Sequence, residues 1–468
     1  MTMRAIRVLI GMSLLILSAC QKDTPVDPSN PTATYSGGNN FTTFDFSENT
    51  FGVQGKNLTT EEENFFVAGN SLFRRNWVTA PASVTSLDGL GPVFNAISCG
   101  SCHFKDGRSA PPAFVDEPLN GLLFRLSIPG ATPFGGPLPE PVYGGQLQDK
   151  AILAVQREGG VRITYTEITG QYADGTSYSL RKPNYEFTDL AYGDLHDDVL
   201  FSPRIGPQIP GLGLLENIPE ATILEYADEH DIDGDGISGR PNYVWDDVHQ
   251  QVSLGRFGWK ANKANLEQQA AGAFNGDMGL VSNLFPEDDW TPAQQTQHGE
   301  EIPNGGNPEL TDDQLKRVTV YLQTLSVPAR RNIDDPMVAK GEKLFEELNC
   351  TGCHRAIMET GQEHKILALN GQTIRPYTDL LLHDMGDGLA DYRPDYLASG
   401  TEWRTPPLWG IGMIQTVNDH SFLLHDGRAR NFEEAILWHG GEAEASKQAY
   451  TQLNKAERDA VTAFLESL

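Results

Sequence analysis

The sequence predicts a mainly α-helical protein of two similar domains, the first of which contains a long insertion of loops and β-hairpins. The pattern C-x-x-C-H occurs twice, at residues 99–103 and 350–354. An amphipathic helix is predicted before each copy and another at the end of each domain, so one plan occurs twice. Between residues 104 and 245, glycine, proline and short strand-like runs indicate the insertion.

The two C-x-x-C-H copies are the most specific pattern in the chain. In this motif two thiols add to the vinyl groups of a porphyrin and the histidine coordinates its iron. The pattern predicts two covalently bound haem c groups and two c-type cytochrome domains, at about 51–327 and 328–468. Structural zinc is the alternative, although a histidine directly follows both cysteine pairs. The predicted haem-binding residues are Cys99, Cys102, His103, Cys350, Cys353 and His354.

The N-terminus predicts export. Arg4 and Arg7 precede an apolar run from Val8 to Leu17, which is too short to span a bilayer and suits a secretory signal. The protein is therefore expected in the periplasm or at the outer membrane.

The end of this segment predicts a lipid anchor. Residues 17–20 resemble a bacterial lipobox, in which the final cysteine, Cys20, is acylated. Residues 1–20 are then a lipoprotein signal peptide, and an uncleaved anchor is the alternative. Residues 21–50 are rich in Pro, Ser, Thr, Asn and Gly and are predicted to form a flexible tether. Contact with the membrane is expected through the N-terminal lipid only.

The composition limits the partners. The formal net charge is -28 at pH 7, which excludes nucleic acid and anionic lipid faces. A basic redox partner, such as a small cytochrome or another electron carrier, fits this charge. Of the five cysteines, four are predicted to bind haem and one to carry lipid, which leaves none for a disulfide.

Caps and apolar periodicity predict the individual elements. Thr59 or Thr60 caps the first helix, whose apolar residues recur at helical spacing up to Trp77. Residues 328–336 form the linker between the domains. Further helices are predicted at 219–229, 266–273, 310–325, 337–348 and 454–468, and strand-like runs at 122–128, 161–169 and 178–180.

Several runs between and after the motifs resemble a known group of proteins. The runs are Gly255–Lys260, Leu266–Ala270, Asp277–Gly279, Trp403–Leu408, Leu424–Arg428 and Phe432–Ile436. They resemble the bacterial di-haem cytochrome c peroxidase and MauG superfamily. Within it they are most similar to the di-haem oxidoreductase branch, whose members are also labelled peroxidases or thiol oxidoreductases. The resemblance covers about residues 55–468.

The resemblance implies that peroxide meets the N-terminal haem, where a glutamine and an acid on the distal side move protons. Gln269 and Asp277 stand at those places. Cleavage of the O–O bond requires a group that takes a proton from one oxygen and returns it to the other. Asp277 replaces the glutamate that is usual in the superfamily and is one methylene shorter. The alternative for Asp277 is a helix cap or a loop carboxylate.

The resemblance also assigns residues near the second haem. Trp259 stands where relatives place an indole between the haems, which implies an electron relay; an ordinary buried tryptophan is the alternative. His439 stands where the peroxidases have a methionine and MauG a tyrosine as the far axial ligand. We expect His354 and His439 to ligate this iron together, at a lower potential than methionine ligation gives. The rival ligands are Met385, Met413 and His383.

An acidic run predicts a calcium site. Asp231, Asp233 and Asp235 occupy alternate positions before Gly236, which suits the preference of calcium for oxygen ligands. The twelfth position is Asn242 instead of glutamate, and the resemblance places a calcium between the domains near this residue. An acidic turn without an ion is the alternative.

Together these features predict an exported di-haem c-type cytochrome oxidoreductase. It is expected to reduce peroxide or another small oxidant at the N-terminal haem, with electrons from the C-terminal haem. One alternative is MauG-like oxidation of a protein or metal complex. The other is an electron-transfer cytochrome without peroxidase activity. The thiol label finds no support, because haem takes both cysteine pairs.

Overall fold

The computed structural model describes residues 33–468, except residues 116, 154, 300 and 301. The predicted signal peptide, its acylation site Cys20 and the tether up to residue 32 lie outside the described residues. Within the described part of the chain, no helix is both long enough and apolar enough to cross a membrane.

The prediction of a mainly α-helical protein is wrong. Helices make up 29 % and strands 19 % of the chain, so the class is mixed. In the described residues the strands form seven small sheets of two or three strands each. Some of these pairs join distant segments, such as β1 (Thr42–Thr43) with β11 (Val327–Pro328). Such pairing is invisible in a local sequence pattern. The strand content was underestimated mainly because the strands of the insertion are longer than the predicted runs.

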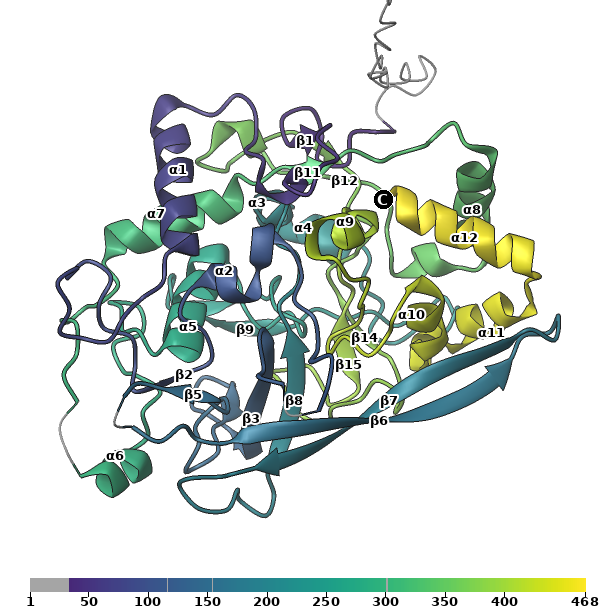
Figure 1. The fold of residues 1–468 in the computed structure, drawn as a ribbon. Helices are drawn as coiled ribbons and strands as arrows, with labels where there is room; N and C mark the ends of the chain where they lie inside the picture. The colour runs from purple at the N-terminus through teal and green to yellow at the C-terminus, as the bar shows by residue number, and fades with distance from the viewer. Residues whose placement is uncertain (1–32, 116, 154, 300–301) are drawn as a thin grey trace, which may run out of the picture. The chain divides into compact units, whose positions relative to one another are not determined.

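The first haem motif is held by a pair of packed helices. Helix α1 (Thr60–Arg74) begins at the N-cap Thr59 with a capping box, and it packs against α7 (Asp312–Gln323) (Figure 1). The two helices approach most closely at Gly69, where an added Cβ would lie 2.1 Å from the carbonyl oxygen of Arg317. Only glycine allows this approach.

The second motif repeats this arrangement. Helix α8 (Pro336–Glu347) leads to the motif and packs against the closing helix α12 (Lys455–Ser467) (Figure 1). A Cβ added at Gly341 would lie 1.9 Å from the carbonyl oxygen of Ala460. At both motifs, a helix before the motif thus packs against a later helix.

The insertion contains the longest strands of the described chain. The predicted strand-like runs correspond to β3 (Leu122–Ala131), β6 (Gly160–Gln171) and β7 (Ser177–Thr188). Strands β6 and β7 form one hairpin that reaches from the region of β3 to that of α11 (Figure 1). At its tip the guanidinium of Arg458, on α12, lies 3.6 Å from the ring centroid of Tyr172. The insertion was expected to lie over the first haem. It thus also contacts α12, in the predicted C-terminal haem domain.

The apolar core is shared between the two predicted haem domains. One buried cluster contains Phe73 and Trp409, and a second contains Trp259 and Phe464, so each takes residues from both sides of residue 328. Part of the predicted tether also packs here, because Phe41 is fully buried. The boundary between the domains stays a prediction.

The remaining elements complete the chain in order. The predicted helix at 219–229 is confined to Glu220–Leu224, because the chain turns at Glu225. The predicted helix at 266–273 extends to Met278. The elements not yet described are, in chain order, β2 (Val93–Phe94), α2 (Cys99–Cys102), β4 (Pro137–Leu138), β5 (Lys150–Ala151), β8 (Leu200–Ile205), α3 (Leu212–Glu216), α4 (Glu220–Leu224), β9 (Tyr243–Asp246), β10 (Gln251–Leu254), α5 (Leu266–Met278), α6 (Pro292–His298), β12 (Met358–Glu359), β13 (Thr373–Ile374), β14 (Leu382–Asp384), β15 (Glu402–Arg404), α9 (Ile414–Asn418), α10 (Phe432–Trp438) and α11 (Glu444–Gln452).

Candidate active site

One cavity joins the two C-x-x-C-H motifs. Its empty volume is about 2880 Å³, including the part that is open to solvent. Apart from the proposed calcium ligands, the structure brings every predicted site residue to this cavity. These lining residues are Cys99, Cys102, His103, Cys350, Cys353, His354, Trp259, Gln269, Asp277 and His439.

The first motif presents a histidine that is ready to bind a metal. The cysteines lie on the short helix α2, and His103 directly follows it. The Nδ1–H of His103 donates to the carbonyl oxygen of Pro207 at 2.8 Å, which leaves Nε2 free. Burial lowers the pKa of His103, so the ring is neutral at pH 7. Burial, followed by the charge of Asp277, raises the pKa of Cys102 to about 12.

The second motif presents two such histidines. The Nδ1–H of His354 donates to the carbonyl oxygen of Tyr377 at 2.9 Å. His439 follows α10, and its Nδ1–H donates to the carbonyl oxygen of Ala435 at 2.7 Å. Burial and, more weakly, the neighbouring His439 lower the pKa of His354 to about 4. The two imidazoles line one cavity, and among the described residues neither Nε2 has a hydrogen-bond partner, which suits the two axial positions of one iron.

Helix α5 supplies the polar groups near the first motif. Gln269, Ala273 and Asp277 are spaced by four residues, so they share one helix face, and all three line the cavity. Gln268 points elsewhere and donates to the carbonyl oxygen of Trp245 at 2.8 Å. Helix α5 begins at Asn265, whose side chain accepts a hydrogen bond from the backbone of Gln268. Asp277 lies near the end of this helix, so it is not the N-cap that the alternative proposed.

Two residues of the insertion hold Asp277. The Nε2 of Gln146 donates to its Oδ1 at 3.0 Å, and the guanidinium of Arg125 lies 3.8 Å from the same oxygen. Burial raises the pKa of Asp277 above its ordinary value, while Arg125 and Gln146 act in the opposite direction. Among the described residues, Oδ2 has no hydrogen-bond partner. The carboxyl group is therefore held on one oxygen and free on the other.

Trp259 lines the cavity together with both motifs. Its Nε1–H donates to the carbonyl oxygen of Ile205 at 2.9 Å, which fixes the indole. The guanidinium carbon of Arg108 lies 5.2 Å from the ring centroid. The side chain is buried, with 8 % of its surface exposed. A rigid indole therefore lies in the wall that the two motifs share.

Comparison with known proteins identifies the family. A family model described as "Di-haem oxidoreductase, putative peroxidase" matches residues 31–468. The chain belongs to the di-haem oxidoreductase family. No curated protein matches it. One solved structure, hydrazine synthase of Kuenenia stuttgartiensis pressurised with 20 bar xenon, is 19% identical over 34% of this chain and 55% of its own, with a TM-score of 0.22.

Family membership makes this di-haem oxidoreductase a redox enzyme with haem cofactors. The residues that the structure places together fit these cofactors. The cavity offers neutral histidines as iron ligands and two cysteine pairs. Its charged lining is mostly basic, with Arg108, Arg204, Arg404 and Lys447 against the single carboxylate of Asp277, although the chain as a whole is strongly acidic. A basic lining suits haem, whose propionates are anionic.

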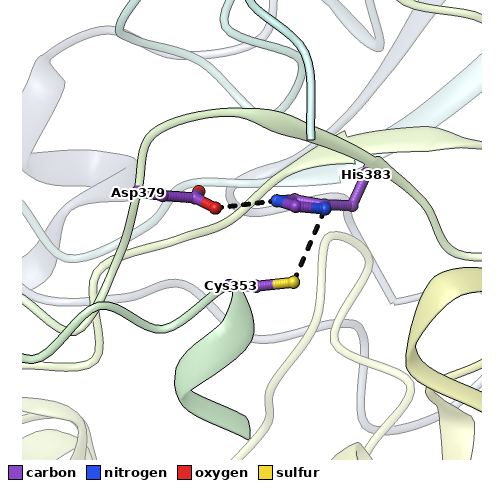
Figure 2. A group of neighbouring side chains, drawn as sticks. All are labelled: Cys353, Asp379 and His383. Atoms are coloured by element: carbon purple, nitrogen blue, oxygen red, sulfur yellow. Dashed lines mark hydrogen bonds and ion pairs between the residues drawn. The ribbon is translucent and has the colours of Figure 1, made fainter. Parts of the chain in front are cut away.

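The structure separates the rival ligands of the second haem. His383 lies between two carboxylates. Its Nε2 is 2.8 Å from Asp379 (Figure 2), and its Nδ1 is 2.7 Å from Glu442. Although its burial acts the other way, these carboxylates raise its pKa well above the ordinary value. Both nitrogens are thus occupied. Met413 is outside the cavity lining, whereas Met385 lies in it and remains a rival of His439.

The zinc alternative finds no support. Cys353 lies within 4.8 Å of Asp379 and His383, measured between their ligand atoms, so these three side chains could hold an ion in the absence of haem (Figure 2). In the described part of the chain, no such group contains more than one cysteine. A zinc site that draws on both cysteine pairs is therefore not formed.

The predicted calcium ligands are only partly brought together. Carboxylates of Asp228, Asp231 and Asp233 lie within 4.8 Å of one another. Asp235 is outside this group. The side chain of Asn242 is used elsewhere, because Nδ2 donates to the carbonyl oxygens of Lys260 and Asp395 and Oδ1 accepts from Leu397. Sequence reasoning missed Asp228, although its position three residues before Asp231 could have indicated it.

Proposed function

We propose that this di-haem oxidoreductase reduces peroxide or another small oxidant at the N-terminal haem, with electrons that enter at the C-terminal haem from a small basic cytochrome or a similar carrier. When bound, the haems supply the electrons and the iron at which the O–O bond is cleaved. Two electrons and two protons convert one hydrogen peroxide into two waters. The single observation that supports the proposal is the polar face of α5, which lines the cavity beside the first motif.

Asp277 is the proposed proton-transfer group. Its Oδ2 takes a proton from the peroxide oxygen nearer to the iron and returns it to the leaving oxygen. Oδ1 stays bound to Gln146, so the carboxyl group keeps its orientation during the transfer. The raised pKa of Asp277 brings its protonated form closer to working pH, which favours the return of the proton. The Gln269 amide, which lies on the same face of α5 as Asp277, orients the peroxide.

Trp259 is the proposed electron relay between the haems. It lines the same cavity as both motifs, and its hydrogen bond to Ile205 and its burial limit ring movement. A fixed aromatic ring keeps the electronic path constant, because its distance to each neighbour does not vary.

A spectrum of the purified holoprotein tests this proposal. We expect one high-spin and one low-spin ferric haem after oxidation. After partial reduction, the high-spin signal should change within seconds of adding peroxide. Two low-spin haems that react with neither peroxide nor small ligands would instead indicate an electron-transfer cytochrome and contradict the proposal.

We also propose that the haems are attached covalently through the two cysteine pairs. The support is the motif and the location of Cys99, Cys102, Cys350 and Cys353 in the cavity, free of disulfides. A denaturing gel stained for haem should show a stained band at the full chain length. Cys350→Ala/Cys353→Ala should halve the bound haem, and an unstained wild-type band would contradict covalent attachment.

We further propose export and acylation at Cys20. The support comes from the sequence of residues 1–20 alone. Labelling with a radioactive fatty acid should mark the wild type and leave Cys20→Ala unlabelled. Equal labelling of both proteins, or a cytoplasmic location, would contradict the proposal.

Finally, we propose calcium binding by Asp231, Asp233 and Asp235, with Asp228 as an additional ligand and without Asn242. The support is the spacing of the carboxylates and the short distances within the group Asp228, Asp231 and Asp233. Calorimetric titration should show weaker calcium binding in Asp231→Asn/Asp233→Asn. The matched control Asp197→Asn removes an exposed carboxylate elsewhere and should leave binding unchanged. Equal binding in all three proteins would contradict this site.

A further inference from the structure

Two of the four basic residues in the cavity wall lack a carboxylate partner. Arg204 pairs with Asp395 at 3.0 Å, and Lys447 pairs with Glu444 at 2.5 Å. Arg108 and Arg404 form no ion pair with any described residue within 4.0 Å. This difference is notable in a chain with 63 acidic and 35 Lys and Arg residues, where carboxylates are plentiful.

Arg108 is buried among neutral acceptors. Only 5 % of its surface is exposed. Its Nε donates to the carbonyl oxygen of Phe422 at 2.9 Å, one Nη donates to that of Leu424, and the other lies 3.5 Å from the amide oxygen of Gln208. These contacts fix the guanidinium over the Trp259 ring. The charge of Asp426 acts on it, but no described carboxylate forms an ion pair with it.

Arg404 is also buried and is bound to the backbone around Trp259. It is 9 % exposed, and its backbone N–H donates to the carbonyl oxygen of Trp259 at 2.9 Å. Its Nε donates to the carbonyl oxygen of Gly258 at 2.9 Å and its Nη1 to that of Thr405 at 3.2 Å. Within the described residues, Nη2 donates to no acceptor.

Burying a guanidinium without an ion-pair partner is unfavourable, so an anion is expected beside each of these groups. Burial lowers the pKa of Arg108 to about 9 and that of Arg404 to about 10, although the charges of Asp426 and Asp379 act in the opposite direction. These two carboxylates form ion pairs with Arg428 and His383 and not with Arg108 or Arg404, whereas each haem carries two propionates. The planar guanidinium fork matches a carboxylate with two parallel hydrogen bonds.

We propose that Arg108 and Arg404 bind haem propionates beside Trp259, and that their charges raise the reduction potential of the haem that they contact. They are positioning residues, because they act on the cofactor's carboxylates and not on the reacting atoms. The proposal rests on the presence of the two haems and is independent of the peroxide chemistry proposed above.

The test compares Arg108→Gln and Arg404→Gln with Arg256→Gln in the purified holoprotein. Arg256 is the matched control, because it also donates only to carbonyl oxygens, those of Leu215 and Ile218, and forms no ion pair in the described chain, but it does not line the cavity. Resonance Raman spectra report the propionate bending modes, and spectroelectrochemistry reports the two potentials. Neither measurement needs peroxide or turnover.

We expect shifted propionate modes and a lower potential of at least one haem in each cavity variant, and wild-type values in Arg256→Gln. A cation stabilises the more negative reduced state, so its loss lowers the potential. Unchanged propionate modes in both cavity variants, or equal shifts in the control, would overturn the proposal.

Lysine variants cover the case in which a glutamine variant does not fold. Arg108→Lys and Arg404→Lys keep the charge but lose the planar fork. We expect a potential near that of the wild type together with a shifted propionate mode. Wild-type propionate modes in both lysine variants would equally overturn the proposal. Loss of peroxide reactivity in any variant does not bear on it, so the two proposals fail separately.

Discussion

The two C-x-x-C-H motifs are alike in sequence and in the helices that hold them, but they face different groups. His103 lies near the carboxyl group of Asp277 on α5, whereas His354 has the imidazole of His439 as its neighbour. The motif itself provides one iron ligand in both cases. On the function proposed above, the group opposite each motif, a proton-transfer group or a second ligand, would suit one haem to reaction and the other to electron transfer.

The largest expected effect comes from His439→Ala, which removes the group that distinguishes the second site. If His439 ligates the iron, the second haem should change completely from low-spin to high-spin, while the first haem keeps its spectrum. Absorption and electron paramagnetic resonance spectra measure this change. His439→Met is the control, because it can restore ligation and should raise the potential. An unaltered spectrum of His439→Ala would point to Met385 instead.

The next effect tests the first site. Asp277→Asn should slow the reaction with peroxide by about 100-fold or more, the range that loss of a general acid–base group causes, without change in haem content. Stopped-flow absorption measures the rate. Asp289→Asn is the matched control. Burial also raises the pKa of Asp289 and the charge of Arg125 lowers it, but Asp289 lies outside the cavity lining. An equal loss of rate in both variants would contradict the role of Asp277.

A moderate effect is expected from substitutions at the contacts of the two helix pairs. Gly69→Ala and Gly341→Ala place a Cβ against backbone atoms, and each should lower the free energy of unfolding by about 1–3 kcal/mol through overpacking. Denaturant unfolding of the holoprotein measures the loss. Gly145→Ala is the control, because an added Cβ there meets nothing within 4 Å. Wild-type stability in either helix variant would show that the corresponding helix pair separates easily.

The smallest effect concerns the hairpin that joins the insertion to the second haem segment. Hydrogen bonds from Thr176, and then the contact with Arg458, lower the pKa of Asp174 to about 2. A carboxyl group with a depressed pKa stabilises the folded state above its unfolded pKa of about 3.9, and this contribution is lost as the pH falls through about 2. Proteolysis at the hairpin tip should therefore increase between these pH values. In Asp174→Asn the tip should be cut equally at both pH values. A pH dependence that persists in this variant would contradict the role of Asp174.

The sequence predicted elements best where the signal was local. The N-cap at Thr59 or Thr60, the strand-like runs of the insertion and the amphipathic pattern at 454–468 all correspond to elements of the structure, because each depends on neighbouring residues. The fold class was wrong because the strands of the insertion are longer than the predicted runs, and because the strands β8, β9 and β10 were not predicted.

The same distinction holds for the site. Cysteine and histidine in C-x-x-C-H are recognisable wherever they occur, and Asp277 and Gln269 stood within runs that resemble the family. Gln146 and Arg125, which hold Asp277, lie in the insertion without any local pattern, so no sequence signal could have found them.

By itself, the sequence determined the two C-x-x-C-H motifs and the helices next to them, because adjacent backbone positions are sufficient to specify both. Only the tertiary structure decided what faces each motif. It set His383 between two carboxylates, brought His439 into the same cavity as His354 and left Arg108 without an ion-pair partner beside Trp259. The physical reason is that burial and charge pairing depend on residues far apart in the chain, which only packing brings together.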